Sequence, residues 1–270
     1  MENWEPIIRR MELLLRLKTF PIAFKLLEDA REIEDNKWIR RPTKKFTLCQ
    51  LITVVRTYDW TIGATADDLV GPGCSGMIGL EDKPDYIKDG SFRSIVWCKT
   101  REDARKCEEQ MPSIPVGKYN AVIMGPLVYN PFDPDIVLIY GNPAQMIILI
   151  NALQFEDYEQ FQFFCVGESA CADSIARCYL NNKPSLAIPC YGERRYGHVQ
   201  DDELVMALPA SWMKKAIKGL DELYKRGVRY PISQYGAQAD PTPGFPPSYH
   251  VLWGGSEEDT GFKRFDSYCQ

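Results

Sequence analysis

Cysteine is the residue type with the most chemical potential in this sequence. The chain has nine cysteines, an odd number, and only two histidines, His198 and His250. A thiolate is both a metal ligand and a nucleophile, whereas two imidazoles are a poor supply for a His-rich metal centre or a histidine-based hydrolase. We therefore expect any reactive or metal-binding centre to be built from thiols. The cysteines stand at positions 49, 74, 98, 107, 165, 171, 178, 190 and 269.

Four of these cysteines share a local setting. Cys49 falls in the first turn of a predicted helix, Cys74 ends a Gly-Pro-Gly turn, Cys171 falls near the start of a further helix, and Cys190 follows a strand. The free N–H groups of a helix N-terminus favour negative charge by about 0.3–1 kcal/mol, which lowers the pKa of a thiol and suits it to metal ligation. We interpret the other five as core or surface residues: Cys98, Cys107, Cys165, Cys178 and Cys269.

The spacing of the four cysteines does not by itself define a shared metal site. They are separated by 24, 96 and 18 intervening residues, and no C-x-x-C occurs in the chain. The ferredoxin run and the zinc-ribbon pattern are therefore both absent.

Four other residues close to these cysteines could take part in catalysis. Asp173 is a candidate general base, although a carboxylate at the start of a helix also serves as a cap. Arg194 could clamp a substrate carboxylate or form an exposed ion pair. Tyr191 could act as an acid or pack against a neighbour. His198 could donate a proton or be a surface-loop histidine.

Alternating strands and helices are expected to position these residues. The pattern predicts an α/β or interleaved α+β fold, with a mixed β-sheet and flanking helices. Residues 71–76 are glycine-rich and predict a loop that opens a short helix. The expected strands are residues 22–27, 60–65, 91–97, 119–124, 135–140, 161–166, 185–188 and 204–208. Helices are expected from about residue 7 to before 21, and over residues 47–55, 100–111, 143–153, 169–179 and 211–226.

The chain divides into a domain and an arm. Residues 1–230 predict a single α/β domain, whereas residues 231–270 contain five prolines and five glycines. The same forty residues carry seven aromatic residues, too many for a disordered tail. We expect an irregular arm that wraps its own domain or a partner subunit, the latter giving a homo-oligomer.

Composition and motifs exclude several classes of function. The net charge is −5 and charged residues make up 26% of the chain, which disfavours a nucleic-acid binder. No apolar run reaches the roughly 18 residues of a membrane span, and the N-terminus is unlike a signal peptide, so we expect a cytoplasmic protein. No G-x-G-x-x-G or P-loop match occurs, so the chain has no nucleotide fingerprint.

A set of short segments, in one order, resembles the domain of unknown function 169 family. This is a family of uncharacterised proteins common in anaerobic bacteria and archaea, and the resemblance covers about residues 10–230. The segments are FPIAFK (20–25), CQL (49–51), GCSG (73–76) with GL (79–80), GPL (125–127), PDIV (134–137) with GNPAQ (141–145), CAD (171–173) and CYGER (190–194).

The resemblance implies a shared site for the four cysteines. The recurring cysteines of the family correspond to Cys49, Cys74, Cys171 and Cys190, and some members have a further cysteine at the position of Glu193. This implies one 4Fe-4S cluster, whose negative charge helix N-termini and the guanidiniums of residues 194 and 195 would stabilise. Structural zinc usually takes two tight C-x-x-C knuckles instead.

The expected function is that of an iron-sulfur protein, an enzyme of anaerobic metabolism acting on a small organic substrate. A cluster with an open iron would serve a lyase or hydratase as a Lewis acid, and a fully ligated one would serve an oxidoreductase. One alternative is a metal-free or zinc-stabilised protein that binds a small ligand through residues 71–76 and 190–195. Another is a thiol-dependent enzyme that uses Cys74 as its nucleophile.

Overall fold

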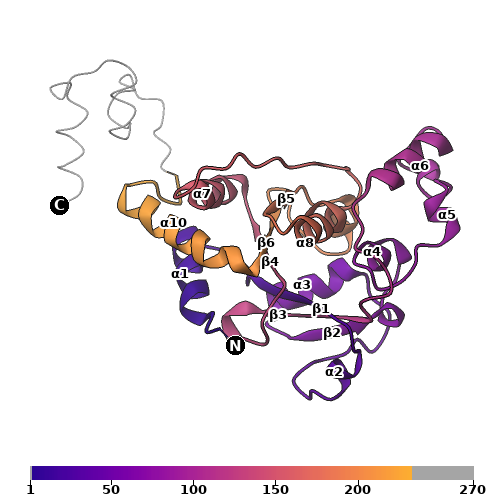
Figure 1. Cartoon of the computed structure of the whole chain (residues 1–270), viewed down its shortest axis with the longest axis horizontal. Coiled ribbons are helices and arrows are strands. Elements are labelled where there is room, and N and C mark those ends of the chain that lie inside the picture. Colours follow the sequence, from indigo (N-terminus) through magenta and orange to yellow (C-terminus); the bar gives the residue numbers. More distant parts are fainter. Residues whose placement is uncertain (1, 233–270) are drawn as a thin grey trace.

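The computed structural model describes residues 2–232, which form helices on both faces of one six-stranded sheet (Figure 1). The strand order is β2-β3-β1-β4-β6-β5, and each pair of neighbouring strands is antiparallel. The predicted class, helices flanking a sheet, is confirmed in its interleaved α+β form, but the sheet expected to be mixed is antiparallel throughout its named strands. The strands are β1 (Ile22–Leu27), β2 (Ile62–Thr65), β3 (Ala121–Pro126), β4 (Ile136–Gly141), β5 (Ser185–Ala187) and β6 (Leu204–Pro209).

Helices of very different length surround the sheet. The α-helices are α1 (Glu5–Leu15), α2 (Arg31–Glu34), α3 (Leu48–Tyr58), α4 (Pro72–Met77), α5 (Asp85–Lys88), α6 (Arg101–Gln110), α7 (Pro143–Gln154), α8 (Arg177–Asn181), α9 (Tyr191–Arg195) and α10 (Met213–Lys225). A π-helical turn, Ala172–Ala176, runs directly into α8. Short 3-10 helices are Ala66–Asp68, Arg93–Ile95, Leu127–Tyr129 and Ala210–Trp212.

The two faces of the sheet support two separate cores. Alternate residues of a strand point to opposite faces, so Phe24 packs with α3 and residues 170–178, whereas Ala23 packs with α1, α7 and α10. Figure 1 shows α1, α7 and α10 gathered at one end of the molecule and α4, α5 and α6 at the other. The candidate cysteines all lie on the face that carries α3.

Two capping boxes fix where the principal helices of each face begin. Thr47 accepts a hydrogen bond from the Gln50 N–H, while the Gln50 side chain accepts one from the Thr47 N–H, so α3 begins at Leu48 as predicted. Asn142 and Gln145 form the same arrangement at the start of α7. The first box places Cys49 in the first turn of its helix.

The predicted strand at residues 91–97 is wrong. This segment contains the 3-10 helix Arg93–Ile95, and Ile95 and Val96 are 79% and 68% exposed. The segment has the composition of a strand, but it pairs with no strand of the sheet. Instead Arg93 turns inward, and its guanidinium pairs with two buried glutamates.

The predicted strand at residues 161–166 is also wrong, because the segment pairs with no named strand. Phe161 and Phe163 pack against the α1-α7-α10 core, while the Phe164 ring lies beside the Arg177 guanidinium. The predicted loop at residues 71–76 is corrected too: most of it is α4 itself, which follows Gly71 with a φ of +87°.

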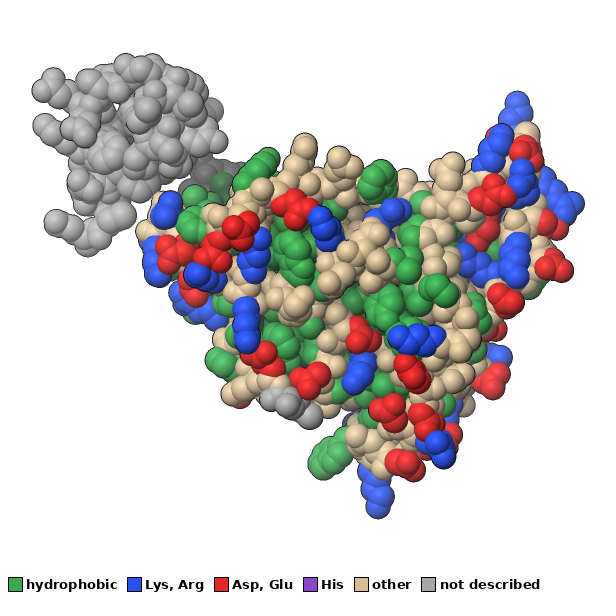
Figure 2. All heavy atoms as spheres, viewed as in Figure 1, with side chains coloured by type: hydrophobic (Ala, Val, Ile, Leu, Met, Phe, Trp, Pro, Cys, Tyr) green, Lys and Arg blue, Asp and Glu red, His purple; other side chains and the backbone are tan. Residues whose placement is uncertain are grey.

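Charged side chains of both signs cluster on the part of the surface formed by α5 and α6 (Figure 2). None of the helices formed by residues 2–232 is both long and apolar enough to cross a membrane. The arm expected at residues 231–270 lies, apart from its first two residues, outside the described part of the chain.

Candidate functional site

The fold brings the four predicted cysteines to one place. Cys49 is the second residue of α3, Cys74 is the third residue of α4, Cys171 lies in the turn before the π-helix, and Cys190 is the N-cap of α9. The Cys74 and Cys171 side chains are hydrogen-bonded to each other. Cys49, Cys171 and Cys190 each interact electrostatically with Cys74. Four segments distant in the sequence thus contribute to a single thiol cluster.

The thiols of this cluster differ in acidity. Burial raises the pKa of Cys49 to about 12, and burial also raises the pKa of Cys190. The pKa of Cys171 lies well above its ordinary value, because this thiol is hydrogen-bonded to Cys74 and is buried. Cys74 is the exception: the same hydrogen bond, together with Arg93 and Lys83, holds the pKa of Cys74 below its ordinary value despite burial.

A buried carboxylate, Glu193, belongs to the same cluster. Glu193 is 3% exposed, and its charge acts on the pKa values of all four thiols. Its Oε1 accepts a hydrogen bond of 2.9 Å from the Tyr140 hydroxyl, whereas its Oε2 has no hydrogen-bond partner. Burial raises the pKa of Glu193 to about 7, although the Tyr140 hydrogen bond and Arg56 oppose the shift.

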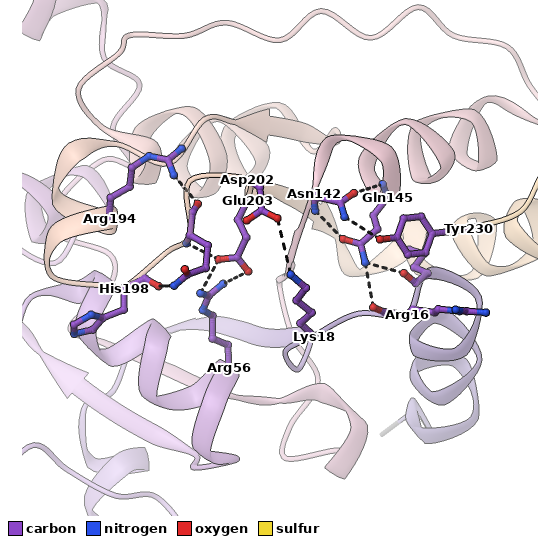
Figure 3. Close-up of polar contacts among 12 residues, drawn as sticks. Arg16, Lys18, Arg56, Asn142, Gln145, Arg194, His198, Asp202, Glu203 and Tyr230 are labelled. Atoms are coloured by element: carbon purple, nitrogen blue, oxygen red, sulfur yellow. Dashed lines mark hydrogen bonds and ion pairs between the residues drawn. The ribbon is translucent and has the colours of Figure 1, made fainter. Parts of the chain in front are cut away.

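Buried polar residues support Tyr140, the residue that binds Glu193. The Arg56 guanidinium lies 4.4 Å from the Tyr140 ring centroid and forms two hydrogen bonds, of 2.9 and 3.1 Å, with Glu203. Glu203 also accepts the Gln200 N–H at 2.8 Å. Figure 3 shows Arg56 directed at Glu203, with Lys18 approaching the neighbouring Asp202. A series of contacts therefore leads from the Glu193 carboxylate through Tyr140 and Arg56 to Glu203 and Gln200.

Cations lie on the Cys74 side of the cluster. Arg93 is buried and pairs with Glu108 and Glu168, and Lys83 also pairs with Glu108. Burial would lower the pKa of Arg93, but the two glutamates raise it, so the guanidinium is charged. These cations stabilise negative charge on the nearby Cys74 thiolate.

Two backbone features bring the segments together. The π-helical turn that follows Cys171 is a rare conformation that is frequent at functional sites. At Gly197, a Cβ atom would stand 3.1 Å from the Cys49 carbonyl oxygen and 2.7 Å from the Glu193 carbonyl oxygen. Only glycine allows this close approach of the segment after α9 to α3.

The three predicted catalytic residues lie within four positions of a site cysteine along the chain, but each already has other contacts. The Asp173 carboxylate accepts the Val166 N–H at 2.9 Å and pairs with Arg177 at 3.5 Å, and burial raises its pKa. Arg194 donates to the Gln200 carbonyl oxygen at 2.6 Å (Figure 3). Tyr191 is exposed, with its ring 5.8 Å from that of Trp97.

His198 is exposed, and its ring points away from the polar contacts drawn in Figure 3. The remaining cysteines of the described chain lie elsewhere in the fold. Cys178 is buried in the core, where burial alone raises its pKa, and Cys165 is exposed. Cys98 and Cys107 are partly exposed and lie near each other on the α6 side.

The sequence reasoning missed the support for the site, namely Tyr140 and Arg56, and treated Glu193 only as a position where relatives differ. One signal was available. Tyr140 is the one residue with a polar side chain in the strand IVLIYG, and Arg56 interrupts the apolar pattern of its helix, so both side chains needed buried partners.

The site offers the donor types that an iron-sulfur cluster uses, namely four thiols beside one carboxylate. Within residues 2–232, no group of three or more His, Cys, Asp or Glu side chains is arranged to hold a metal ion. Four thiols, an unpartnered carboxylate oxygen and nearby cations suit an anionic iron-sulfur cluster.

The comparisons with known proteins identify a family without giving a function. The family model described as "Uncharacterised ArCR", domain of unknown function 169, matches residues 10–219. Uncharacterized protein MJ0308 of Methanocaldococcus jannaschii is 27% identical over 220 residues, which cover 78% of this chain and 90% of that protein. No solved structure matches the chain. The chain belongs to the domain of unknown function 169 family.

Proposed function

We propose that this protein binds one 4Fe-4S cluster through Cys49, Cys74, Cys171 and Cys190. The main support for this proposal is that these four thiols come from four separate segments and all interact with one buried carboxylate, Glu193. The four were singled out by their local sequence, and other described cysteines, such as Cys178 and Cys165, lie elsewhere.

The electrostatics of the site support an anionic group. A cluster with four thiolate ligands is negatively charged, and Arg93 and Lys83 lie on the Cys74 side of the site. In the metal-free protein the pKa values of three thiols are raised, so these thiols are protonated at neutral pH. Binding iron would deprotonate them, because the ligand is the thiolate.

We further propose that the protein is a cytoplasmic enzyme of anaerobic metabolism acting on a small organic substrate. A bound cluster would supply electron transfer, or Lewis-acid chemistry of the lyase or hydratase type if one iron stays open. The exposed Tyr191 and the half-buried Arg194 lie on α9, directly after Cys190, where they could contact a substrate. All eight cysteines of the described chain are free thiols, as expected in a reducing compartment.

Iron analysis of matched cysteine variants tests the proposal. Each of the four site cysteines would be replaced by Ser, with Cys178→Ser as the control, because Cys178 is as buried as Cys171 but its pKa shows no influence of the other thiols. We expect the four site variants to lose most of the iron that anaerobically prepared wild type holds, and the control to keep it. Equal iron in all five variants would contradict the proposal.

A second candidate function, thiol catalysis by Cys74, is favoured by one observation. Cys74 has the only lowered pKa among the four thiols, because of the Cys171 hydrogen bond and the neighbouring Arg93 and Lys83. A lowered pKa makes a thiol a better nucleophile at neutral pH. Selective modification of Cys74 by iodoacetamide in iron-free protein, with loss of activity, would support this function; an unmodified Cys74 would exclude it.

A further inference from the structure

We propose that Glu193 is a fifth protein ligand of the metal centre, and that its Oε2 binds an iron that one of the four thiolates also binds. The proposal rests on the proposed iron-sulfur function and specifies it further. It makes the centre a mixed sulfur and oxygen site rather than one held by thiolates alone.

The two oxygens of Glu193 have unequal surroundings. Oε1 accepts the Tyr140 hydroxyl at 2.9 Å, while Oε2 is buried and has no hydrogen-bond partner. An ionised carboxylate oxygen that is buried without a partner is strongly unfavourable, so it is expected to be neutralised or to meet a cation. The charge of Glu193 acts on Cys49, Cys74, Cys171 and Cys190, which places the carboxylate among the thiols.

The nearest positive groups do not meet this need. Arg56 uses its two terminal nitrogens on Glu203 and presents its guanidinium to the face of the Tyr140 ring. The side chain of Arg194 reaches the Gln200 carbonyl oxygen and lies 3.7 Å from Asp201. Neither arginine pairs with Glu193, so the ionised carboxylate lacks a cation at Oε2, and a bound iron would supply one.

Tyr140 and Arg56 are positioning residues in this arrangement. The Tyr140 hydroxyl fixes the rotation of the carboxylate by binding one oxygen, which leaves the other oxygen for a metal. Arg56, held by Glu203, fixes the Tyr140 ring. A carboxylate is a harder ligand than a thiolate, so the iron bound by Glu193 would differ electronically from the other irons.

The test compares the wild-type protein with Glu193→Gln and Tyr140→Phe after anaerobic loading with ⁵⁷Fe and sulfide. Mössbauer spectra report the surroundings of each iron, and a chelator measures the rate of iron release. We expect one distinct iron subsite in the wild type, its loss in Glu193→Gln, and iron release at least about tenfold faster in that variant. Tyr140→Phe keeps the carboxylate and should release iron at an intermediate rate.

Asp135→Asn serves as the matched control, because Asp135 is a partly buried carboxylate that binds the Leu26 N–H. Identical spectra and release rates in wild type and Glu193→Gln would overturn the inference while leaving the four-thiolate cluster intact. Wild type that takes up no iron would overturn the proposed function as well. If Glu193→Gln does not fold, a Tyr140→Phe protein with wild-type spectrum and release rate would overturn the inference.

Discussion

Glu193 makes the stability of the metal-free protein depend on pH. Burial raises the pKa of this carboxyl from 4.5 to about 7 in the folded state. Between these values the folded chain holds a proton that the unfolded chain has released. Stability therefore falls as the pH rises from about 4.5 to about 7.

We expect Glu193→Gln to remove this dependence in the metal-free protein. A shift from 4.5 to about 7 corresponds to about 3 kcal/mol, so the variant should gain that much stability relative to wild type between pH 4.5 and pH 8. Urea unfolding at several pH values measures the difference between the two proteins. A difference that does not change with pH would show that the folded and unfolded pKa values of Glu193 are alike.

The loss of Arg56 should destabilise the protein strongly. It forms a buried pair with Glu203, and removing one partner leaves the other charge unpaired. We expect Arg56→Leu to lower the free energy of unfolding by about 3–5 kcal/mol. The double variant Arg56→Leu, Glu203→Leu should recover most of that loss, because no unpaired charge remains. Urea unfolding of the three proteins checks this, and a double variant as unstable as the single one would contradict it.

At the scale of elements, the capping box of α3 links secondary structure to the site. We expect Thr47→Ala to cost about 1 kcal/mol of stability and to accelerate iron release, because Thr47 also contacts the Cys49 sulfur at 3.1 Å. Asn142→Ala is the control, since it removes the equivalent cap of α7 on the opposite face. It should cost a similar amount without changing iron release. Equal rates of iron release in the two variants would show that the Thr47 cap does not support the site.

The elements that the sequence predicts well are those with local signals. Thr47 and Asn142 cap their helices, and the apolar run at residues 135–140 forms the central strand β4. The segments at residues 91–97 and 161–166 failed because strand composition does not show whether a pairing partner exists. In the first, the decisive interaction is between Arg93 and distant glutamates, which no local pattern reveals.

Only the part of the site that has local sequence signals could be predicted. The four cysteines were identified by their positions at the starts of helices and by the family segments. Their supporting residues were not, because Tyr140, Arg56 and Glu193 meet only after β4, α3 and α9 have packed together. The roles of Asp173, Arg194 and Tyr191 in catalysis stay predictions.

At the scale of the whole molecule, a mutation on the α7-α10 face of the sheet should lower stability without affecting iron binding on the α3 face. Gly219 in α10 packs so closely on α7 that a Cβ atom would stand 2.0 Å from the Ala152 carbonyl oxygen. We expect Gly219→Ala to lower the free energy of unfolding by at least about 1–3 kcal/mol without changing the iron content of the folded protein. Gly73→Ala, where a Cβ meets no atom within 4 Å, is the control for stability. Thermal unfolding and iron analysis check both, and a folded Gly219→Ala protein without iron would contradict this separation.

The central claim is that four thiols from four segments hold one iron-sulfur cluster. The most direct test is an assay of iron and acid-labile sulfide on wild-type protein purified without oxygen. We expect a brown protein with about four irons and about four sulfides per chain. A colourless protein that remains free of iron and sulfide after anaerobic reconstitution, yet is folded and active, would contradict the claim.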